Sequence, residues 1–390
     1  MIASARLRPA YVLHWPCNTI LRRTRAYQET AINVRERFLR ICNFEPAAPP
    51  HWDTLGFWNE TVARWRMEGL PAGVDPGAYF GQEGAYRLPV DSGFCHIPLL
   101  PAFEHEVLAD EGESIVFRDA QGIVKRDRKP EFGVSMSQFL DFPVKGRADW
   151  EALKWRLDPD TPERYPNWSE LGFLDAPDLP VMAHICGAYG TPRNLFGEER
   201  LAYAYYDQPD LIHDIQRHWT DFYCRLFSRV LEHARLDYVY IWEDMAFKNG
   251  PLISPKTFAE FMLPYYKELN SHLRSLGVKM IMVDSDGDPR PLLDMFVESG
   301  VNFFMPFEIA AGMDPLPIRE KYGDKLVIWG GIDKRELAKD LDAVEREVAG
   351  KVPKLMETGG FIPAVDHLVP PDVSFENYSR FIELVRQICG

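Results

Sequence analysis

The sequence has few cysteines and no long apolar run. Its six cysteines stand far apart, and none shows the Cys-x-x-Cys spacing of a zinc or redox motif. Scattered thiols of this kind are typical of a reducing compartment. No segment approaches the roughly 20 uninterrupted apolar residues of a spanning helix, and residues 1–25 lack the apolar core and cleavage site of a signal peptide. We therefore expect a soluble cytoplasmic protein without a membrane partner.

Positive charge is also scarce. The chain has 44 Lys and Arg against 58 Asp and Glu, which gives a formal net charge of −14. This balance argues against binding to nucleic acid or to anionic membranes, and more weakly against a polyanionic substrate. The sequence also lacks a Gly-x-Ser-x-Gly nucleophile turn and a Gly-rich phosphate loop after a strand. We therefore predict a protein that acts on a small molecule. It is expected to use neither a serine nucleophile nor a dinucleotide-binding sheet.

The second half of the chain is regular. Hydrophobic residues make up 46% of the 390 residues, which is enough for a large core. After Leu179, strand-like runs alternate with helical stretches, and this alternation indicates parallel strands joined by right-handed crossovers. With one or two further strands from the first half, it predicts an α/β fold of the (β/α)8 TIM-barrel type. The expected strands are Val181–Cys186, Tyr238–Trp242, Lys279–Val283, Asn302–Met305, Leu326–Trp329 and Gly360–Ala364, and the expected helices are Asp210–Ala234, Pro255–Leu276, Pro289–Glu298, Pro315–Tyr322, Arg335–Glu357 and Ser374–Ile388.

The first half is less regular. Residues 1–30 show no lasting periodicity and are expected to form a loosely ordered extension. A helix is expected at Asn33–Ile41, and an aromatic, partly helical region follows around Trp52, Trp58 and Trp65. These tryptophans are interpreted first as core packing, with an aromatic pocket wall as the alternative.

The segment Ser114–Lys125 has the pattern of a β-hairpin. Two β-prone runs flank the short turn sequence Asp-Ala-Gln-Gly. A hairpin at this place is an insertion on a larger domain, since the barrel strands are expected elsewhere. We therefore predict one barrel domain over residues 31–390, with an N-terminal helical and aromatic extension and a hairpin insertion.

Acidic residues follow the apolar run Lys279–Val283. Side chains alternate along a strand, so Asp284 and Asp286 are expected on one face. The active sites of TIM barrels lie where strands end and the following loops begin. Polar residues recur at this place in other strands, and we expect the whole set to converge at the mouth of the barrel. The others are His184 and Cys186, Trp242 with Glu243 and Asp244, Glu308, and Asp366 with His367.

Two kinds of chemistry could use this set. Asp284, Asp286, His367 and Cys186 could hold a divalent metal, and the His and Cys favour zinc with an open position for a thiol or water. Alternatively, an acid with a shifted pKa could transfer a proton or stabilise a cation without a metal. Structural interpretations also stand, because a buried thiol often packs in a core and an acid such as Asp244 often caps a helix.

Several phrases of the second half occur together in one known superfamily. They are Ile253-Ser254-Pro255, Val283-Asp284-Ser285-Asp286-Gly287-Asp288, Gly330-Gly331-Ile332-Asp333-Lys334, and Ile362-Pro363-Ala364-Val365-Asp366-His367. The set resembles the uroporphyrinogen decarboxylase (URO-D) superfamily, which also contains corrinoid-dependent methyltransferases such as the methylcobamide:thiol methyltransferases. The resemblance covers residues 31–388 in layout and implies a (β/α)8 barrel with its site at the mouth.

The chain departs from both kinds of enzyme within this resemblance. True uroporphyrinogen decarboxylases grip the porphyrinogen carboxylates with an Arg-rich N-terminal motif, whereas the matching region here reads Leu-Gly-Phe-Trp-Asn-Glu-Thr at 55–61. Their Gly-Asn-Leu-Asp-Pro phrase is Gly-Gly-Ile-Asp-Lys at 330–334. In the methyltransferases zinc is held by a His-x-Cys where this chain has Asp284 and Asp286, and by a later Cys near Asp366. The sequence His184-Ile185-Cys186 matches the His-x-Cys pattern of that zinc motif, but it lies two strands earlier in the chain.

The resemblance implies an enzyme, and methyl transfer is the reaction we expect. The methyl group of a small methylated substrate would pass to a corrinoid on a separate cobalamin-binding protein, with zinc or an acid such as Glu243 polarising the leaving atom. The alternatives are a decarboxylase, in which Asp244 or Asp286 stabilises a cation, and a barrel that binds without catalysis. A homodimer is compatible with each. The expected catalytic residues are Glu243, Asp244 and Asp286, and the expected substrate-binding residues are His184, Trp242, Asp284, Glu308 and His367.

Overall fold

A computed structural model of the chain describes residues 32–52, 55–132 and 136–390. The loosely ordered extension expected over residues 1–30 lies outside the described residues. The single domain expected over residues 31–390 likewise stays a prediction. Within the described ranges, no helix is both long enough and apolar enough to cross a membrane.

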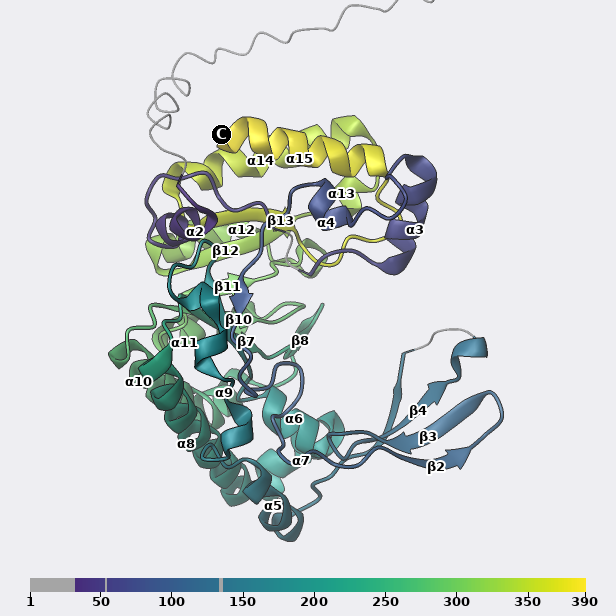
Figure 1. The fold of residues 1–390 in the computed structure, drawn as a ribbon, viewed down its shortest axis with the longest axis vertical. Coiled ribbons are helices and arrows are strands. Elements are labelled where there is room, and N and C mark those ends of the chain that lie inside the picture. The colour runs from purple at the N-terminus through teal and green to yellow at the C-terminus, as the bar shows by residue number, and fades with distance from the viewer. Residues whose placement is uncertain (1–31, 53–54, 133–135) are drawn as a thin grey trace, which may run out of the picture.

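Seven parallel strands form one curled sheet at the centre of the fold (Figure 1). All six strands expected in the second half are present, and the first two match their expected bounds. The architecture is therefore the TIM-barrel-like α/β fold that the sequence predicts. In spatial order the strands are β1 (Tyr86–Arg87), β6 (Val181–Cys186), β7 (Tyr238–Trp242), β10 (Met280–Asp284), β11 (Phe303–Met305), β12 (Val327–Ile332) and β13 (Phe361–Val365).

Helices surround this sheet and connect its strands (Figure 1). They are α2 (Val34–Cys42), α3 (Asn59–Glu68), α4 (Pro76–Tyr79), α5 (Arg147–Leu153), α6 (Gly190–Phe196), α7 (Glu198–Asp207), α8 (Pro209–His233), α9 (Pro255–Phe261), α10 (Leu263–Ser275), α11 (Arg290–Glu298), α12 (Pro315–Tyr322), α13 (Lys334–Leu337), α14 (Leu341–Thr358) and α15 (Phe375–Cys389). Short 3-10 helices lie at Pro130–Phe132, Lys154–Arg156, Pro162–Arg164, Trp168–Glu170, Gly172–Leu174, Ile309–Ala311 and Gly323–Lys325.

Two expected helices are each divided in the structure. The expected helix Pro255–Leu276 breaks at Met262, because Pro264 has no N–H to continue the hydrogen-bond ladder and instead lies in the first turn of α10. The expected helix Arg335–Glu357 is α13 followed by α14, since the Asp340 side chain accepts from the Ala343 N–H and starts a new helix. Helices α6 and α7 were not expected from the sequence.

The side chains of the sheet alternate between two cores. Inward-facing residues such as Met282, Phe303 and Trp329 fill the inside of the curled sheet. Outward-facing residues such as Val283 and Phe304 pack beneath the helices. Because both faces of every central strand are covered, these strands read as continuous apolar runs in the sequence.

Helix α2 closes the end of the barrel where the strands begin. Phe38 is fully buried, and its ring lies 5.3 Å from that of Tyr238 and 6.1 Å from that of Phe303, measured between ring centroids. Arg35 of the same helix pairs with the buried Asp237 at 2.8 Å. The opposite end, where the strands end, carries the loops that contain the predicted site residues.

The hydrogen-bond ladder of the sheet does not close between β13 and β1 within the described ranges. The Trp329 side chain donates from Nε1 to the Trp52 carbonyl at 3.0 Å, and the two indole rings lie 4.5 Å apart. Phe57 makes a single parallel bridge with Val369. Trp52 and Phe57 therefore contact β12 and the loop after β13 without a regular eighth strand in the described ranges.

The expected hairpin is part of a larger insertion. Strands β3 (Ser114–Arg118) and β4 (Val124–Arg128) form the hairpin, which confirms the prediction, and β2 (Glu106–Asp110) and β5 (Gln138–Asp141) extend it to a four-stranded antiparallel sheet. This sheet projects from the barrel (Figure 1). A short ribbon of β8 (Ala246–Phe247) and β9 (Gly250–Pro251) follows β7 at the mouth.

Candidate active site

Asp284 and Tyr240 form a buried polar pair at the mouth of the barrel. Asp284 is the last residue of β10, and Tyr240 lies on the neighbouring β7. The Tyr240 hydroxyl donates to Asp284 Oδ2 at 2.5 Å. Burial and the nearby charge of Asp286 raise the pKa of Asp284 to about 8, and the hydrogen bond from Tyr240 only partly opposes them. Burial therefore favours the neutral form of the Asp284 carboxyl group.

Asp286 and His367 form a second polar pair beside the first. His367 Nε2 lies 3.2 Å from Asp286 Oδ2. Burial lowers the pKa of His367, but the hydrogen bond to Asp286 and its negative charge outweigh burial, and the net shift is upward. Burial raises the pKa of Asp244, and the charge of Asp286 adds to this while Arg193 and His367 oppose it. The structure thus brings Asp244, Asp286 and His367 into one electrostatic group, and their roles stay predictions.

Arg193 of α6 holds the loop after β7. Its guanidinium lies 4.6 Å from the ring centroid of Trp242, donates to the Asp244 carbonyl at 2.7 Å, and lies 3.3 Å from Asp244 Oδ2. The backbone of Asp244 has a φ of 45°, in the left-handed region that non-glycine residues seldom adopt. Such a conformation persists only where the surroundings fix it, and it occurs often at functional sites. Arg193 is one of the groups that fix it.

Glu308 and Asp366 hold the loops of the mouth together. Glu308 accepts from the Gly287 N–H at 3.3 Å and from Lys334 Nζ at 3.1 Å. Asp366 accepts from the Ile309 N–H at 2.9 Å and from the Lys334 N–H at 3.1 Å. These bonds connect the loops that follow β10, β11, β12 and β13. Both acids are therefore engaged by the chain itself, and the substrate-binding role expected of Glu308 stays a prediction.

The Glu243 side chain is fully buried and is held by groups of the chain itself. Its Oε2 accepts from the Tyr189 N–H at 2.9 Å and the Gly190 N–H at 2.8 Å, and its Oε1 bonds to the Tyr266 hydroxyl. Burial raises the pKa of Glu243 to about 7, against these hydrogen bonds. A Cβ at Gly187 would lie 2.2 Å from Glu243 Cδ, so the turn after β6 fits closely around the side chain. The chain itself therefore engages both carboxylate oxygens of Glu243, and the catalytic role expected of it stays a prediction.

His184 and Cys186 both lie on β6 but have different surroundings. The His184 ring stacks on Phe94 at 4.3 Å and meets Tyr240 edge-on at 4.6 Å. Burial lowers the pKa of His184 to about 3, so its imidazole is neutral. Burial raises the pKa of the Cys186 thiol to about 12. The expected packed-core interpretation therefore describes Cys186 well, whereas His184 lines the inside of the sheet next to the Tyr240–Asp284 pair.

The predicted zinc set does not fit the geometry. Structural and catalytic zinc sites use three or four protein ligands. In the part of the chain that the structure describes, no group of three or more His, Cys, Asp or Glu side chains is placed to hold one metal ion. The residues Asp284, Asp286, His367 and Cys186 are thus not assembled as ligands, and we derive no step through a metal.

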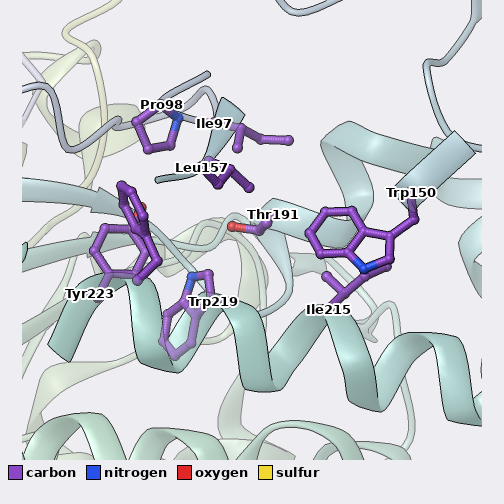
Figure 2. A pocket seen from close by; sticks show the side chains of 9 residues that line it. Ile97, Pro98, Trp150, Leu157, Thr191, Ile215, Trp219 and Tyr223 are labelled. Carbon is purple, nitrogen blue, oxygen red and sulfur yellow. The ribbon is translucent and has the colours of Figure 1, made fainter. Parts of the chain in front are cut away.

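Two hollows lie away from the acids. The first is a mainly apolar cavity of about 10 Å³, roughly the space of one water molecule (Figure 2). Its walls are Ile97, Pro98, Trp150, Leu157, Thr191, Ile215, Trp219, Phe222 and Tyr223. The second, of about 450 Å³, opens where β6 begins and is lined by Arg35, His233 and Arg235 among others. The candidate site is therefore defined by the chemistry of the mouth, not by these hollows.

Three residues of the site were not expected from the sequence. Tyr240 could have been found, because it lies two residues before Trp242 on the same strand face. Arg193 was missed together with α6, the helix that carries it. Lys334 stands in a quoted phrase, but its contacts with Glu308 and Asp366 depend on the arrangement of separate loops.

The fold and the mouth together define an enzyme of the barrel class. Acids from several strand ends meet at one site, as in TIM-barrel enzymes generally. The chain belongs to the uroporphyrinogen decarboxylase (URO-D) family, whose sequence profile matches residues 174–388. This confirms the resemblance found in the sequence.

Individual relatives are distant. The chain is 23% identical over 321 residues to the uroporphyrinogen decarboxylase of Hydrogenovibrio crunogenus, covering 75% of this chain and 82% of that protein. It is 20% identical over 218 residues to the chloroplastic uroporphyrinogen decarboxylase 2 of Oryza sativa subsp. japonica, covering 56% of this chain and only 52% of that protein. A solved methyltransferase from Methanosarcina mazei matches 92% of this chain and 100% of its own length, with a TM-score of 0.60 and 16% identity. That likeness supports the fold alone.

Proposed function

We propose that this protein is a methyltransferase that removes a methyl group from a small methylated substrate and passes it to a corrinoid on a separate protein. The single observation that carries the proposal is the neutral acid Asp284, which is placed at the end of β10 and oriented by the Tyr240 hydroxyl. A methyl group leaves an oxygen or nitrogen far more readily when that atom receives a proton. Asp284 is a group of the mouth that can supply this proton at neutral pH.

The reaction balances with the residues present. The bond between the methyl carbon and the heteroatom breaks, and its electron pair stays on the heteroatom, which takes the proton of Asp284. The corrinoid, when bound, supplies the nucleophile that accepts the methyl group. Asp284 is left as a carboxylate in a buried place, where Tyr240 donates to it. Because the charged form is unfavourable there, Asp284 then recovers a proton from solvent and returns to its starting state.

The cations of the mouth support a substrate with little negative charge. Arg193 is bound by Asp244, and Lys334 is bound by Glu308 and lies 3.5 Å from Asp366. Neither is free to bind the carboxylates of a polyacid. Arg87 of β1 contributes a positive charge near His184, which helps to lower the pKa of that imidazole. One exposed arginine fits one acidic group more readily than a porphyrinogen with many carboxylates.

Decarboxylation is the second candidate, and the relatives favour it. The two sequence relatives above are both named uroporphyrinogen decarboxylases. The Asp286–His367 pair could stabilise a cation that forms before CO2 leaves, with Asp286 as the negative partner. The absence of an Arg-rich motif at residues 55–61 remains the main argument against a porphyrinogen substrate.

The two candidates give different products in one pair of assays. The purified protein is mixed with free cob(I)alamin and, in separate reactions, with methyl ethers, methylamines and methyl thioethers, and loss of the cob(I)alamin absorbance is followed. In parallel, CO2 release from uroporphyrinogen is measured. We expect methyl transfer from one substrate class and no CO2. Release of CO2 without any methyl transfer would contradict the proposal and establish the second candidate.

A further inference from the structure

An arginine faces the inside of the curled sheet on its first strand. Arg87 of β1 pairs with Met182 of β6 in the parallel register, and Met182 belongs to the core inside the sheet. The preceding residue, Tyr86, faces outward and stacks on Phe173 at 4.4 Å between ring centroids. Side chains alternate along a strand, so Arg87 lies on the inner face. The residue is nevertheless exposed, which means that solvent reaches the inner face beside β1.

The chain leaves this guanidinium available to a ligand. Arg87 Nη2 lies 3.4 Å from the Gly93 carbonyl oxygen, longer than the roughly 2.7–3.2 Å of most such hydrogen bonds. Among the described residues, no Asp or Glu side chain forms an ion pair with Arg87. Arg193 at the same mouth differs, because it is paired with Asp244. The planar fork of N–H donors on a free guanidinium matches the two oxygens of a carboxylate.

The loop after β1 fixes the surroundings of Arg87. Ser92 Oγ donates to the His184 carbonyl at 2.7 Å, and the Ser92 carbonyl accepts from the Tyr223 hydroxyl at 2.9 Å. Gly93 has a φ of 82°, and a Cβ there would lie 2.6 Å from a backbone oxygen of the same loop. The loop therefore has little freedom, and the Gly93 carbonyl beside Arg87 is held in place.

A row of inward side chains connects Arg87 with the proposed proton donor. His184 on β6 pairs with Tyr240 on β7, and their ring centroids lie 4.6 Å apart. The Tyr240 hydroxyl donates to Asp284 Oδ2 at 2.5 Å. At the other end of the row, the charge of Arg87 adds to burial in lowering the pKa of His184. Across the neighbouring strands β1, β6, β7 and β10, the row is Arg87, His184, Tyr240 and Asp284.

The two ends of this row are close enough for one small molecule. Neighbouring strands lie roughly 4.8 Å apart, so three spacings separate β1 from β10, or about 14 Å along the sheet. The curl of the sheet and the inward reach of both side chains shorten this path. The inner residues Met182, Met280 and Met282 are buried and apolar. The inside of the sheet thus offers a cation and an acid on either side of apolar side chains.

We propose that Arg87 binds a carboxylate at one end of the substrate, so that the substrate class is a methylated compound with a single carboxylate. The methyl group then lies at the other end, next to Asp284. This inference deepens the proposed function and rests on it for the identity of the reaction. A single carboxylate fits because Arg87 is one guanidinium, and because Asp244 and Asp286 at the same mouth oppose further negative charge.

The test measures binding, so it does not require methyl transfer. The probes are methoxyacetate, 3-methoxypropanoate and 4-methoxybutanoate, each compared with its uncharged amide, since the series samples the distance between Arg87 and Asp284. Saturation-transfer difference NMR on the full chain gives a dissociation constant for each probe. We expect at least one acid to bind about 10-fold to about 100-fold more tightly than its amide, because hydrogen bonds between a guanidinium and a carboxylate are charge-assisted.

Three variants locate the contact. Arg87→Gln should bind that acid about 10-fold more weakly or worse and leave binding of the amide unchanged. Arg87→Lys keeps the charge but not the planar fork, so its affinity should lie between the two. Arg235→Gln is the matched control and should not change binding, because Arg235 is also exposed and lines the hollow where β6 begins. Circular dichroism and the midpoint of thermal unfolding check that each variant is folded.

Two results would overturn the inference. One is that no acid of the series binds the wild-type protein more tightly than its amide does. The other is that Arg87→Gln weakens binding of the acid no more than Arg235→Gln does, which would place the carboxylate elsewhere. The proposed reaction fails separately: a protein that binds the acid through Arg87 but transfers no methyl group to cob(I)alamin would support the site and contradict the reaction.

Discussion

At the scale of single residues, the protonation of Asp284 decides what the mouth can do. Burial favours the neutral acid, the neighbouring acids Asp286 and Asp244 favour it further, and Tyr240 and His367 oppose this without reversing it. An acid in this state can give a proton at neutral pH, as other enzymes achieve by placing a carboxyl in an apolar site.

The first prediction is a pH profile. Because the proton donor must be protonated, kcat for methyl transfer should fall as the pH rises through the pKa of about 8. Asp284→Asn should lower kcat by about 100-fold or more, since general acids typically contribute that much. Steady-state rates with saturating methyl acceptor measure both effects.

Asp288→Asn is the matched control, because Asp288 lies in the same loop but is bound by Arg290, which lowers its pKa. This variant should keep the wild-type profile. An Asp284→Asn enzyme with an unchanged alkaline limb would assign the proton to another group.

The second prediction concerns Glu243. Removing its carboxylate in Glu243→Ala leaves two backbone N–H groups and the Tyr266 hydroxyl buried without an acceptor. Each such group costs about 1–3 kcal/mol, so the free energy of unfolding should fall by about 3 kcal/mol or more. Urea unfolding measures this, and Glu243→Gln, which keeps the volume and one acceptor, should lose less. A stable Glu243→Ala protein with kcat reduced about 100-fold would instead support the catalytic role expected from the sequence.

At the scale of elements, local patterns predicted the strands well and the side-chain roles less well. Strands buried on both faces appear as apolar runs, which is why β6 and β7 were found with their bounds. Glu243 could not be assigned, because a position just after a strand does not show whether the side chain turns into the mouth or toward Tyr266. The acids Asp244 and Asp286 and the imidazole of His367 were predicted to converge, and they do.

The third prediction concerns α2 as the closure of the barrel. Phe38→Ala removes a fully buried ring that contacts Tyr238 and Phe303, and should lower the free energy of unfolding by about 3–5 kcal/mol. Arg40→Ala on the same helix breaks only an exposed ion pair with Glu36, so its effect should stay within about 0.5 kcal/mol. Equal effects of the two substitutions in urea unfolding would show that α2 is not part of the cooperative core.

At the scale of the whole molecule, three parts of the fold lie apart from one another. Helix α2 packs where the strands begin, and the acids follow the strand ends. The β2–β5 sheet projects to the side (Figure 1). The alternation of strands and helices was sufficient to predict the barrel class. It was not sufficient to predict that Trp52 packs against Trp329, or that two more strands extend the hairpin, because these depend on contacts between distant segments.

The titration of Asp284 is the measurement that tests the central claim most directly, and it needs no substrate. The protein is labelled with ¹³C at the aspartate carboxyl carbons and titrated by NMR, alongside Asp284→Asn and Tyr240→Phe. We expect one carboxyl with a pKa of about 8 that is absent from Asp284→Asn. In Tyr240→Phe the same carboxyl should titrate at higher pH, because the lost hydrogen bond stabilised the charged form. A spectrum in which every carboxyl titrates below about pH 6 would contradict the claim that Asp284 is the proton donor.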